Sequence, residues 1–186
     1  MKLYVKNMVC NRCIAAVQRE LEAMRLEGGN VTLGEINLDQ EINADEKQQL
    51  SEALSRLGFE LIDDKKSRTI EKIKNIIIQR VHHEESLPQT NLSEVLSSAV
   101  HHDYTYLSNL FSEVEGTTIE KYYIAQKIEK VKELLVYDEL SLSEIAYRLH
   151  YSSVAYLSNQ FKKVTGLTPT HFKQIREGKR KPLDQV

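Results

Sequence analysis

Three short stretches of the first 64 residues have the pattern of β-strands, and two longer stretches between them have the pattern of helices. Leu3 and Val5 alternate with polar residues in the first strand, 2–7, and two more strands are predicted over 30–38, with Gly34 at a bulge, and 59–63. Apolar residues recur every three or four positions over 14–24 and 44–57, which predicts two amphipathic helices. The residues expected to face the core from these helices are Ile14, Val17, Leu21, Met24, Leu50, Ala53, Leu54 and Leu57. The order β-α-β-α-β predicts a small α+β sandwich as a first domain, 1–64.

The segment 63–85 carries one apolar stripe of helical spacing, formed by Ile70, Ile73, Ile77 and Val81. It predicts a helix that follows the first domain. Residues 65–85 are therefore expected to be a linker that is also the first helix of the C-terminal part, and the route by which a signal passes between the two parts.

Residues 92–122 and 142–172 are two copies of one segment. At an offset of 50 they are identical at 11 of 31 positions, and most other apolar positions keep their character. In the second copy the apolar spacing predicts a short helix over 142–149, a polar turn, and a second helix from about Ser153 to Gly166. The buried face of that second helix is expected to hold Val154, Leu157, Phe161 and Val164.

A short helix, a tight turn and a second amphipathic helix together form a helix-turn-helix. The segment between the copies, 118–140, has apolar residues in helical rhythm, which predicts one helix of about 20 residues and about 30 Å. Half-sites one turn apart on B-DNA are separated by about 34–36 Å. One rigid helix of this length is expected to set the second helix of each unit, its reading helix, into successive major grooves of double-stranded DNA.

The stretch LSLSEIAYRLHYSSVAYLSNQFKKVTGLTPTHFKQIR, residues 140–176, resembles the DNA-binding domain of the AraC/XylS family of bacterial transcription regulators. The resemblance extends over residues 68–177. It implies an all-α domain of seven helices in which two helix-turn-helix units are joined by a long helix, and it implies binding to promoter DNA. We assign this domain to residues 86–181.

The outward face of the second reading helix is expected to contact DNA. Short polar side chains and an alanine at its N-terminal end suit base edges, and asparagine can bond adenine in two places. Lys162 and Lys163 are expected to neutralise phosphates. The family often has arginine where Asn159 stands. The candidate contacts are Ser152, Ser153, Ala155, Tyr156, Ser158, Asn159, Lys162 and Lys163.

The first copy has Ser-Glu at 112–113, where the second copy has Lys-Lys at 162–163, and Glu115 follows. Acidic side chains near phosphates oppose DNA binding. The first unit is therefore expected to contact DNA weakly, to be adapted to a protein surface, or to present an acidic solvated face. Its candidate DNA contacts are Tyr104, Thr105, Tyr106, Ser108 and Asn109.

Charge is distributed unevenly along a chain whose formal net charge is −2. Residues 142–181 carry 8 basic and 2 acidic side chains, whereas 92–141 carry 4 basic and 9 acidic ones, so the basic end favours a polyanionic partner. No apolar run approaches the roughly 18–20 residues of a membrane span, and the N-terminus lacks the apolar core of a signal peptide. We therefore expect a cytoplasmic protein with no membrane partner.

Both cysteines of the chain, Cys10 and Cys13, lie three positions apart between the first predicted strand and the first predicted helix. The run Met8-Val9-Cys10-Asn11-Arg12-Cys13, with Gly58-Phe59 later, resembles the heavy-metal-associated domain of copper chaperones, mercury-binding proteins and metal-pumping ATPases. The resemblance implies a ferredoxin-like fold, here shortened to β-α-β-α-β, with Met8 as a core anchor of the loop. It also implies a metal held by Cys10 and Cys13.

The chemistry of the two thiols suits a soft metal ion such as Cu(I). A position at a helix N-terminus is expected to lower the pKa of the Cys13 thiol, and Arg12 adds positive charge. Two thiolates cannot complete the four-ligand shell of structural zinc. The histidines at 82–83 and 101–102 are candidates in principle, and we interpret them as surface or core residues.

These features favour a transcription regulator that responds to a soft metal, and not an enzyme. The alternative within regulation is a redox switch in which Cys10 and Cys13 form a disulfide. A third interpretation is that the N-terminal domain docks a protein that donates metal. A thiol oxidoreductase would leave the repeat unexplained.

Overall fold

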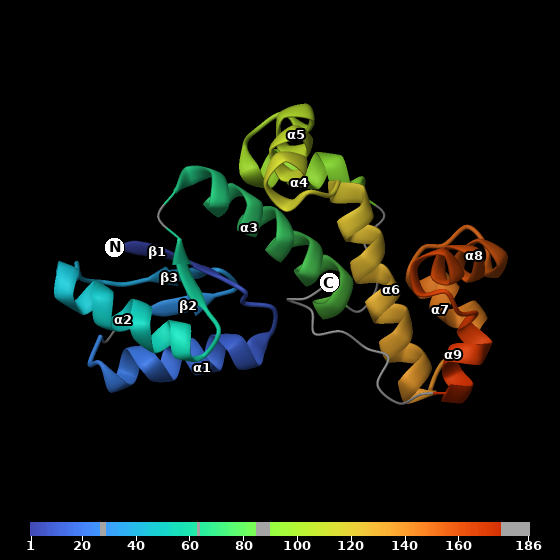
Figure 1. The fold of residues 1–186 in the computed structure, drawn as a ribbon, viewed down its shortest axis with the longest axis horizontal. Coiled ribbons are helices and arrows are strands. Elements are labelled where there is room, and N and C mark those ends of the chain that lie inside the picture. The colour runs from blue at the N-terminus through green and yellow to red at the C-terminus, as the bar shows by residue number, and fades with distance from the viewer. Residues whose placement is uncertain (27–28, 63, 85–89, 176–186) are drawn as a thin grey trace. The chain divides into compact units, whose positions relative to one another are not determined.

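The computed structural model describes residues 1–26, 29–62, 64–84 and 90–175, and the chain divides into two compact units, Met1–Ile76 and Ile77–Val186 (Figure 1). The division falls inside a helix, twelve residues beyond the boundary expected after residue 64. Of the domain assigned to 86–181, residues 86–89 and 176–181 lie outside the described part. Each unit is considered by itself below.

The N-terminal unit has the element order β-α-β-β-α-β, followed by one more helix. The four strands form one antiparallel sheet in the order β2-β3-β1-β4. The elements are β1 (Lys2–Lys6), α1 (Asn11–Ala23), β2 (Asn30–Thr32), β3 (Glu35–Asn37), α2 (Ala44–Arg56), β4 (Glu60–Ile62) and α3 (Lys65–Ile78).

The prediction of a single strand over 30–38 is wrong, because this segment forms two strands, β2 and β3. The predicted order with three strands is therefore also wrong. The chain reverses at Leu33 and Gly34, so that Val31 pairs with Ile36 across a hairpin. Gly34 has φ +81°, a left-handed conformation that glycine adopts without strain, and its carbonyl accepts a hydrogen bond from Val5 N–H at 2.9 Å. The glycine therefore makes a turn and not a bulge.

Helices α1 and α2 cover one face of the sheet, as Figure 1 shows, and bury the alternating residues of its strands. Leu3 and Val5 of β1 and Ile36 of β3 belong to this core. The predicted helix positions are confirmed in part: the buried ones are Val17, Leu21, Leu50, Ala53 and Leu54. Leu57 was expected to face inward and is instead 44% exposed, because α2 ends at Arg56 and Leu57 is its C-cap.

Helix α3 covers the other face of the same sheet (Figure 1). The Arg68 guanidinium stacks 5.0 Å from the ring centre of Tyr4, and Asn75 Nδ2 donates a hydrogen bond to the Leu33 carbonyl at 3.3 Å. Ile70 and Ile73 are buried, as the apolar stripe predicts. The first turns of the expected linker are therefore a structural layer of the N-terminal unit.

Helices are the only regular secondary structure in the described part of the C-terminal unit. It begins in the last residues of α3 and a π-helical turn, η1 (Gln79–His83), in which Val81 is buried as predicted. The remaining helices are α4 (Leu92–Val100), α5 (Tyr104–Glu115), α6 (Ile119–Tyr137), α7 (Leu142–Arg148), α8 (Val154–Thr165) and α9 (Pro169–Ile175).

The repeat in the sequence is also a repeat in the backbone. Helices α5 and α8 have the same length and begin 50 residues apart, as do the first residues of α6 and α9. Helix α5 ends at Gly116 and helix α8 ends at Gly166. Both glycines have the left-handed backbone conformation, which no other residue type adopts as readily. The two predicted helix-turn-helix units, α4–α5 and α7–α8, joined by the long helix α6, are confirmed.

Replacing Gly34 with alanine should destabilise the N-terminal unit more than the same change at Gly58. Both glycines have positive φ, so alanine costs roughly 1–2 kcal/mol at either site. At Gly34, however, a Cβ would clash with Asn75 Nδ2 and displace it from the Leu33 carbonyl, whereas at Gly58 nothing lies within 4 Å. Urea unfolding of the two variants measures the difference, and equal losses would contradict the seating of α3 on the hairpin.

Candidate functional site

The second reading helix, α8, is fixed at both ends and exposed along one face. Ser153 is its N-cap, and the Ser153 Oγ accepts a hydrogen bond from Tyr156 N–H at 3.0 Å. Leu157 and Phe161 are fully buried and hold the helix against the unit. The prediction for Val164 is wrong, because this side chain is 47% exposed.

The predicted DNA contacts of α8 lie together on its solvent side. Ser158 is half-buried, and the exposed ones are Ser152, Ser153, Ala155, Tyr156, Asn159, Lys162 and Lys163. Small and polar side chains lie at the N-terminal end, and the two lysines lie in the last turn. This arrangement can present hydrogen-bonding groups to base edges and positive charge to a phosphate backbone.

The first reading helix, α5, has the same length as α8 and also ends at a glycine, but it has different exposed side chains. Its N-cap, Asp103, accepts a hydrogen bond from Thr105 N–H at 2.8 Å, and this bond lowers the pKa of the Asp103 carboxyl. Glu113 is exposed, where α8 has a lysine. The predicted contacts are half-buried at Tyr104 and Ser108 and exposed at Thr105, Tyr106 and Asn109.

Cys10 and Cys13 lie at the start of α1, with both thiols free and half-buried. Their sulfurs are 3.5 Å apart, and Cys13 N–H donates to the Cys10 carbonyl at 2.9 Å. Met8 is only 1% exposed and anchors the loop in the core, as expected. Asn7, which has φ +70°, donates from Nδ2 to the Gly58 carbonyl at 3.1 Å and so holds the other side of the loop.

The two thiols have opposite pKa shifts, and the prediction for Cys13 is wrong. Cys10, not Cys13, is the N-cap of α1. Burial acts to raise the pKa of Cys10, but the nearby backbone N–H groups of Cys13 and Arg12 and the Cys13 thiol favour the Cys10 thiolate and outweigh burial, so that this pKa is lowered. Burial raises the pKa of Cys13. Cys10 is therefore the more readily ionised thiol.

Helix α3 contacts the base of the cysteine loop. The buried Glu71 carboxylate accepts a hydrogen bond from the Asn7 backbone N–H and lies 3.4 Å from the Lys74 ammonium. Burial raises the pKa of Glu71 in spite of these partners and of the nearby Lys6. Sequence spacing gives no sign of this contact, because 64 residues separate Asn7 from Glu71.

The thiol pair fits a soft ion better than a structural zinc. A separation of 3.5 Å lets both sulfurs bind one ion at about 2.3 Å each. Within the described residues no group of three or more His, Cys, Asp or Glu side chains could hold a metal. His82 is engaged elsewhere, with its Nε2 2.9 Å from Gln126 Oε1.

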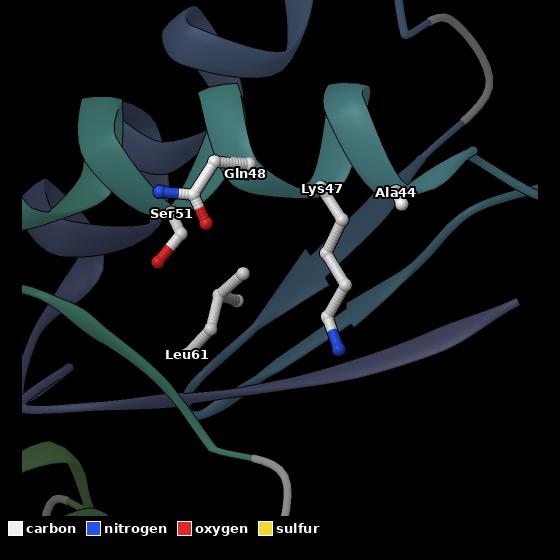
Figure 2. A pocket seen from close by; sticks show the side chains of 5 residues that line it. All are labelled: Ala44, Lys47, Gln48, Ser51 and Leu61. Carbon is white, nitrogen blue, oxygen red and sulfur yellow. The ribbon is translucent and has the colours of Figure 1, made fainter.

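A cavity of about 240 Å³ lies between α2 and the edge strand β4 (Figure 2). Its lining is Ala44, Lys47, Gln48 and Ser51 of α2 and Leu61 of β4. Small-molecule sites usually measure about 300–1,000 Å³. The cavity includes none of the residues predicted to bind metal or DNA.

Sequence reasoning missed a contact behind α8. Tyr151, in the turn before this helix, is buried, and its hydroxyl donates to Gln160 Oε1 at 2.8 Å. The ring of Tyr151 lies under the ammonium of Lys127, which comes from α6. The only sequence signal is an aromatic residue in an otherwise polar turn.

Comparison with known proteins agrees with the geometry of the C-terminal unit. Residues 96–175 match the family described as "Helix-turn-helix domain". Over 65 residues the chain is 35% identical to the xylose operon regulatory protein of Escherichia coli K12. The aligned segment is 35% of this chain and only 17% of the length of that relative.

Two solved structures share the same fold. The C-terminal domain of AraT, a response regulator from Geobacillus stearothermophilus, is 25% identical, with a TM-score of 0.50, and the match covers 60% of this chain and 88% of that one. A transcriptional regulator with an AraC-type DNA-binding domain from Chromobacterium violaceum is 18% identical, with a TM-score of 0.52 and coverage of 60% and 94%. No described helix is long and apolar enough to cross a membrane.

Alkylation should distinguish the two thiols. At pH 7.5 the lowered pKa of Cys10 gives it the larger thiolate fraction, so iodoacetamide should modify Cys10 several times faster than Cys13. Peptide mass spectrometry of reduced, metal-free protein gives both rates. Unfolding in urea should make the rates converge, and faster modification of Cys13 in the folded protein would contradict the assignment of Cys10 as the cap.

Proposed function

We propose, from the AraC/XylS-type helix-turn-helix domain in the C-terminal unit, that the protein is a transcription regulator that binds promoter DNA and responds to a soft metal ion. The observation that carries the DNA-binding part is the repeated helix-turn-helix unit. Its two copies have reading helices of the same length and are joined by α6, and one reading helix has an exposed basic end. Its relatives and structural neighbours are regulators, and we propose no enzymatic activity for this chain.

The spacing of the two units suits double-stranded DNA. Helix α6 has 19 residues, which at 1.5 Å per residue is about 29 Å. Successive major grooves on one face of B-DNA lie about 34 Å apart. The second unit, with Lys162 and Lys163, would dominate the affinity, and the first would contribute a weaker contact because Glu113 and Glu115 oppose phosphates.

Removing the two lysines of α8 should weaken DNA binding, whereas removing the equivalent side chains of α5 should not. Each lost phosphate contact reduces the salt slope by about 0.9, so Lys162→Ala with Lys163→Ala should lower the slope by nearly 2 together with the affinity. Fluorescence anisotropy at several salt concentrations measures both quantities. The matched control, Ser112→Ala with Glu113→Ala, removes no phosphate contact and should lower neither the affinity nor the slope. Equal losses in the two variants would contradict the proposed difference between the units.

The sensing part of the proposal rests on the thiol pair. Cys10 and Cys13 would hold the ion, and Met8 would keep the loop in place from the core. The lowered pKa of Cys10 favours the thiolate that a metal needs. A soft ion such as Cu(I) would suit two sulfur ligands, and because metal binding displaces the thiol protons it would remove the hydrogen bond between the two sulfurs. We propose a metal-donor protein as the source of the ion.

Helix α3 would carry the signal. Its Glu71 accepts a hydrogen bond from Asn7 at the base of the cysteine loop, and the helix continues without a break to Ile78 and into η1. Within the C-terminal unit, His82 of η1 contacts Gln126 of α6, the helix that joins the two reading units. A change at the loop would thus reach α6 along one helix.

The second candidate signal is oxidation. Two free thiols 3.5 Å apart need to approach only to about 2.0 Å to form a disulfide, and the lowered pKa of Cys10 makes it the attacking thiolate. This candidate uses the same residues and the same route through α3. It differs in requiring an oxidant and no metal.

A double substitution tests the sensor. Under reducing conditions Cu(I) should change the DNA affinity of the wild-type protein at least about fivefold, the lower end of typical allosteric couplings, and should not affect Cys10→Ser with Cys13→Ser. Anisotropy with and without the metal measures the effect. A metal effect that survives the double substitution excludes the pair as the sensor, and a response to an oxidant in the presence of a chelator favours the disulfide.

Glu71→Met is the second variant for this experiment. It removes the acceptor for Asn7 N–H at similar volume, so that thiolate absorption should still report metal binding while the DNA response shrinks. A full DNA response in this variant would exclude Glu71 from the route.

A further inference from the structure

Lys127 lies in the middle of α6 with its ammonium group in an aromatic environment. Its Nζ is 3.9 Å from the ring centre of Tyr151 and 5.7 Å from that of Tyr123. The residue is only 9% exposed. Within the described part of the chain it has no ion pair with a carboxylate, so the ring of Tyr151 is its main compensation for lost hydration.

Tyr151 connects this ammonium to the reading helix. It lies in the turn between α7 and α8, is 8% exposed, and donates its hydroxyl hydrogen to Gln160 Oε1 in α8 at 2.8 Å. Its ring also contacts Tyr156, one of the predicted DNA contacts, with centroids 6.0 Å apart. One side chain therefore touches α6 by its ring face and α8 by its hydroxyl.

The first unit lacks this connection. At the offset of 50, Tyr151 corresponds to His101, which is exposed and forms the left-handed cap of α4. Gln160 corresponds to Leu110, which is buried and has no acceptor. The connection is thus present only in the unit that carries the basic reading surface.

We propose that Lys127 is a positioning residue for α8: its ammonium holds the ring of Tyr151, and Tyr151 fixes the direction in which α8 leaves the turn. The inference rests on the proposed function in that α8 is taken to read DNA. Lys127 itself touches no base and no phosphate. Its effect on DNA affinity passes through Tyr151 and Gln160.

The charge of Lys127 makes this role testable by pH. Burial lowers the pKa of Lys127 to about 8, while burial raises the pKa of both Tyr151 and Tyr123, the titratable groups that face it. Of these three groups only the lysine therefore changes charge between pH 7 and 9. Because a lysine pKa below its ordinary value means that the folded state binds fewer protons, its deprotonation adds stability as pH rises. A loss of affinity in this range then comes from positioning and not from unfolding.

Three variants separate the possibilities: Lys127→Met, Lys127→Arg and, as a matched control, Lys121→Met at the exposed start of α6. The probe is a fluorescein-labelled DNA duplex enriched from random sequences with the wild-type protein. We expect Lys127→Met to bind about tenfold more weakly at pH 7 with an unchanged salt slope, the size of a desolvated cation–π contact. We expect the affinity of the wild type to fall between pH 7 and 9. Arginine, which stays charged, should restore binding and remove this fall.

Two results would overturn the proposal. A salt slope reduced by about one in Lys127→Met would mean that Lys127 contacts a phosphate directly. Binding in Lys127→Met equal to that in Lys121→Met would mean that the charge has no positioning role.

Hydrogen exchange of the α8 amides, measured without DNA, keeps the inference separate from the proposed function. Faster exchange over residues 154–160 in Lys127→Met, with unchanged exchange in α1, supports the positioning role even where no DNA binding is detected in the wild type. Unchanged exchange in α8 would contradict it.

Discussion

Burial of helix α6 is the constraint on which the C-terminal unit depends. Eleven of its nineteen residues are buried. The charged ones include Lys132, which pairs with the buried Glu129, and Lys130, which pairs with the half-buried Glu133. Helices α5, α7, α8 and α9 all pack on it. Since both helix-turn-helix units are attached to the same rigid helix, the distance between their reading helices is set by the chain and not by a flexible linker.

The two helix-turn-helix units share one backbone arrangement on α6 and differ in the exposed side chains of their reading helices. The caps and the apolar face of each reading helix are repeated at an interval of 50 residues, whereas the exposed side chains are free to differ because the frame does not use them. One unit has Lys162 and Lys163 at the end of its reading helix, and the other has Ser112 and Glu113. The phenol of Tyr151 and its contact with Lys127 occur only on the basic side. The proposed difference in DNA affinity between the two units is therefore matched by a difference in their structures.

Sequence patterns predict what depends on neighbours along the chain. The helical period located α6 and the isoleucine stripe of α3, and the repeat located the second reading helix. Prediction failed where one residue decides between two local structures. Gly34 turns the chain where a bulge was expected, and Leu57 and Val164 lie where a helix ends and its buried face no longer continues. The contacts of Lys127 with Tyr151 and of Glu71 with Asn7 join residues 24 and 64 positions apart, and no periodic pattern connects such pairs.

The proposed coupling between the thiol pair and the DNA-binding surface is tested most directly by thermodynamic reciprocity. A metal that changes DNA affinity by some factor requires that DNA change the metal affinity by the same factor. The measurement is a competition titration of Cu(I) against a chelator, with the protein free and with it saturated by DNA, under reducing conditions. The account predicts two different Cu(I) dissociation constants whose ratio equals the metal-induced change in DNA affinity. Identical constants for the free and the DNA-bound protein would contradict it.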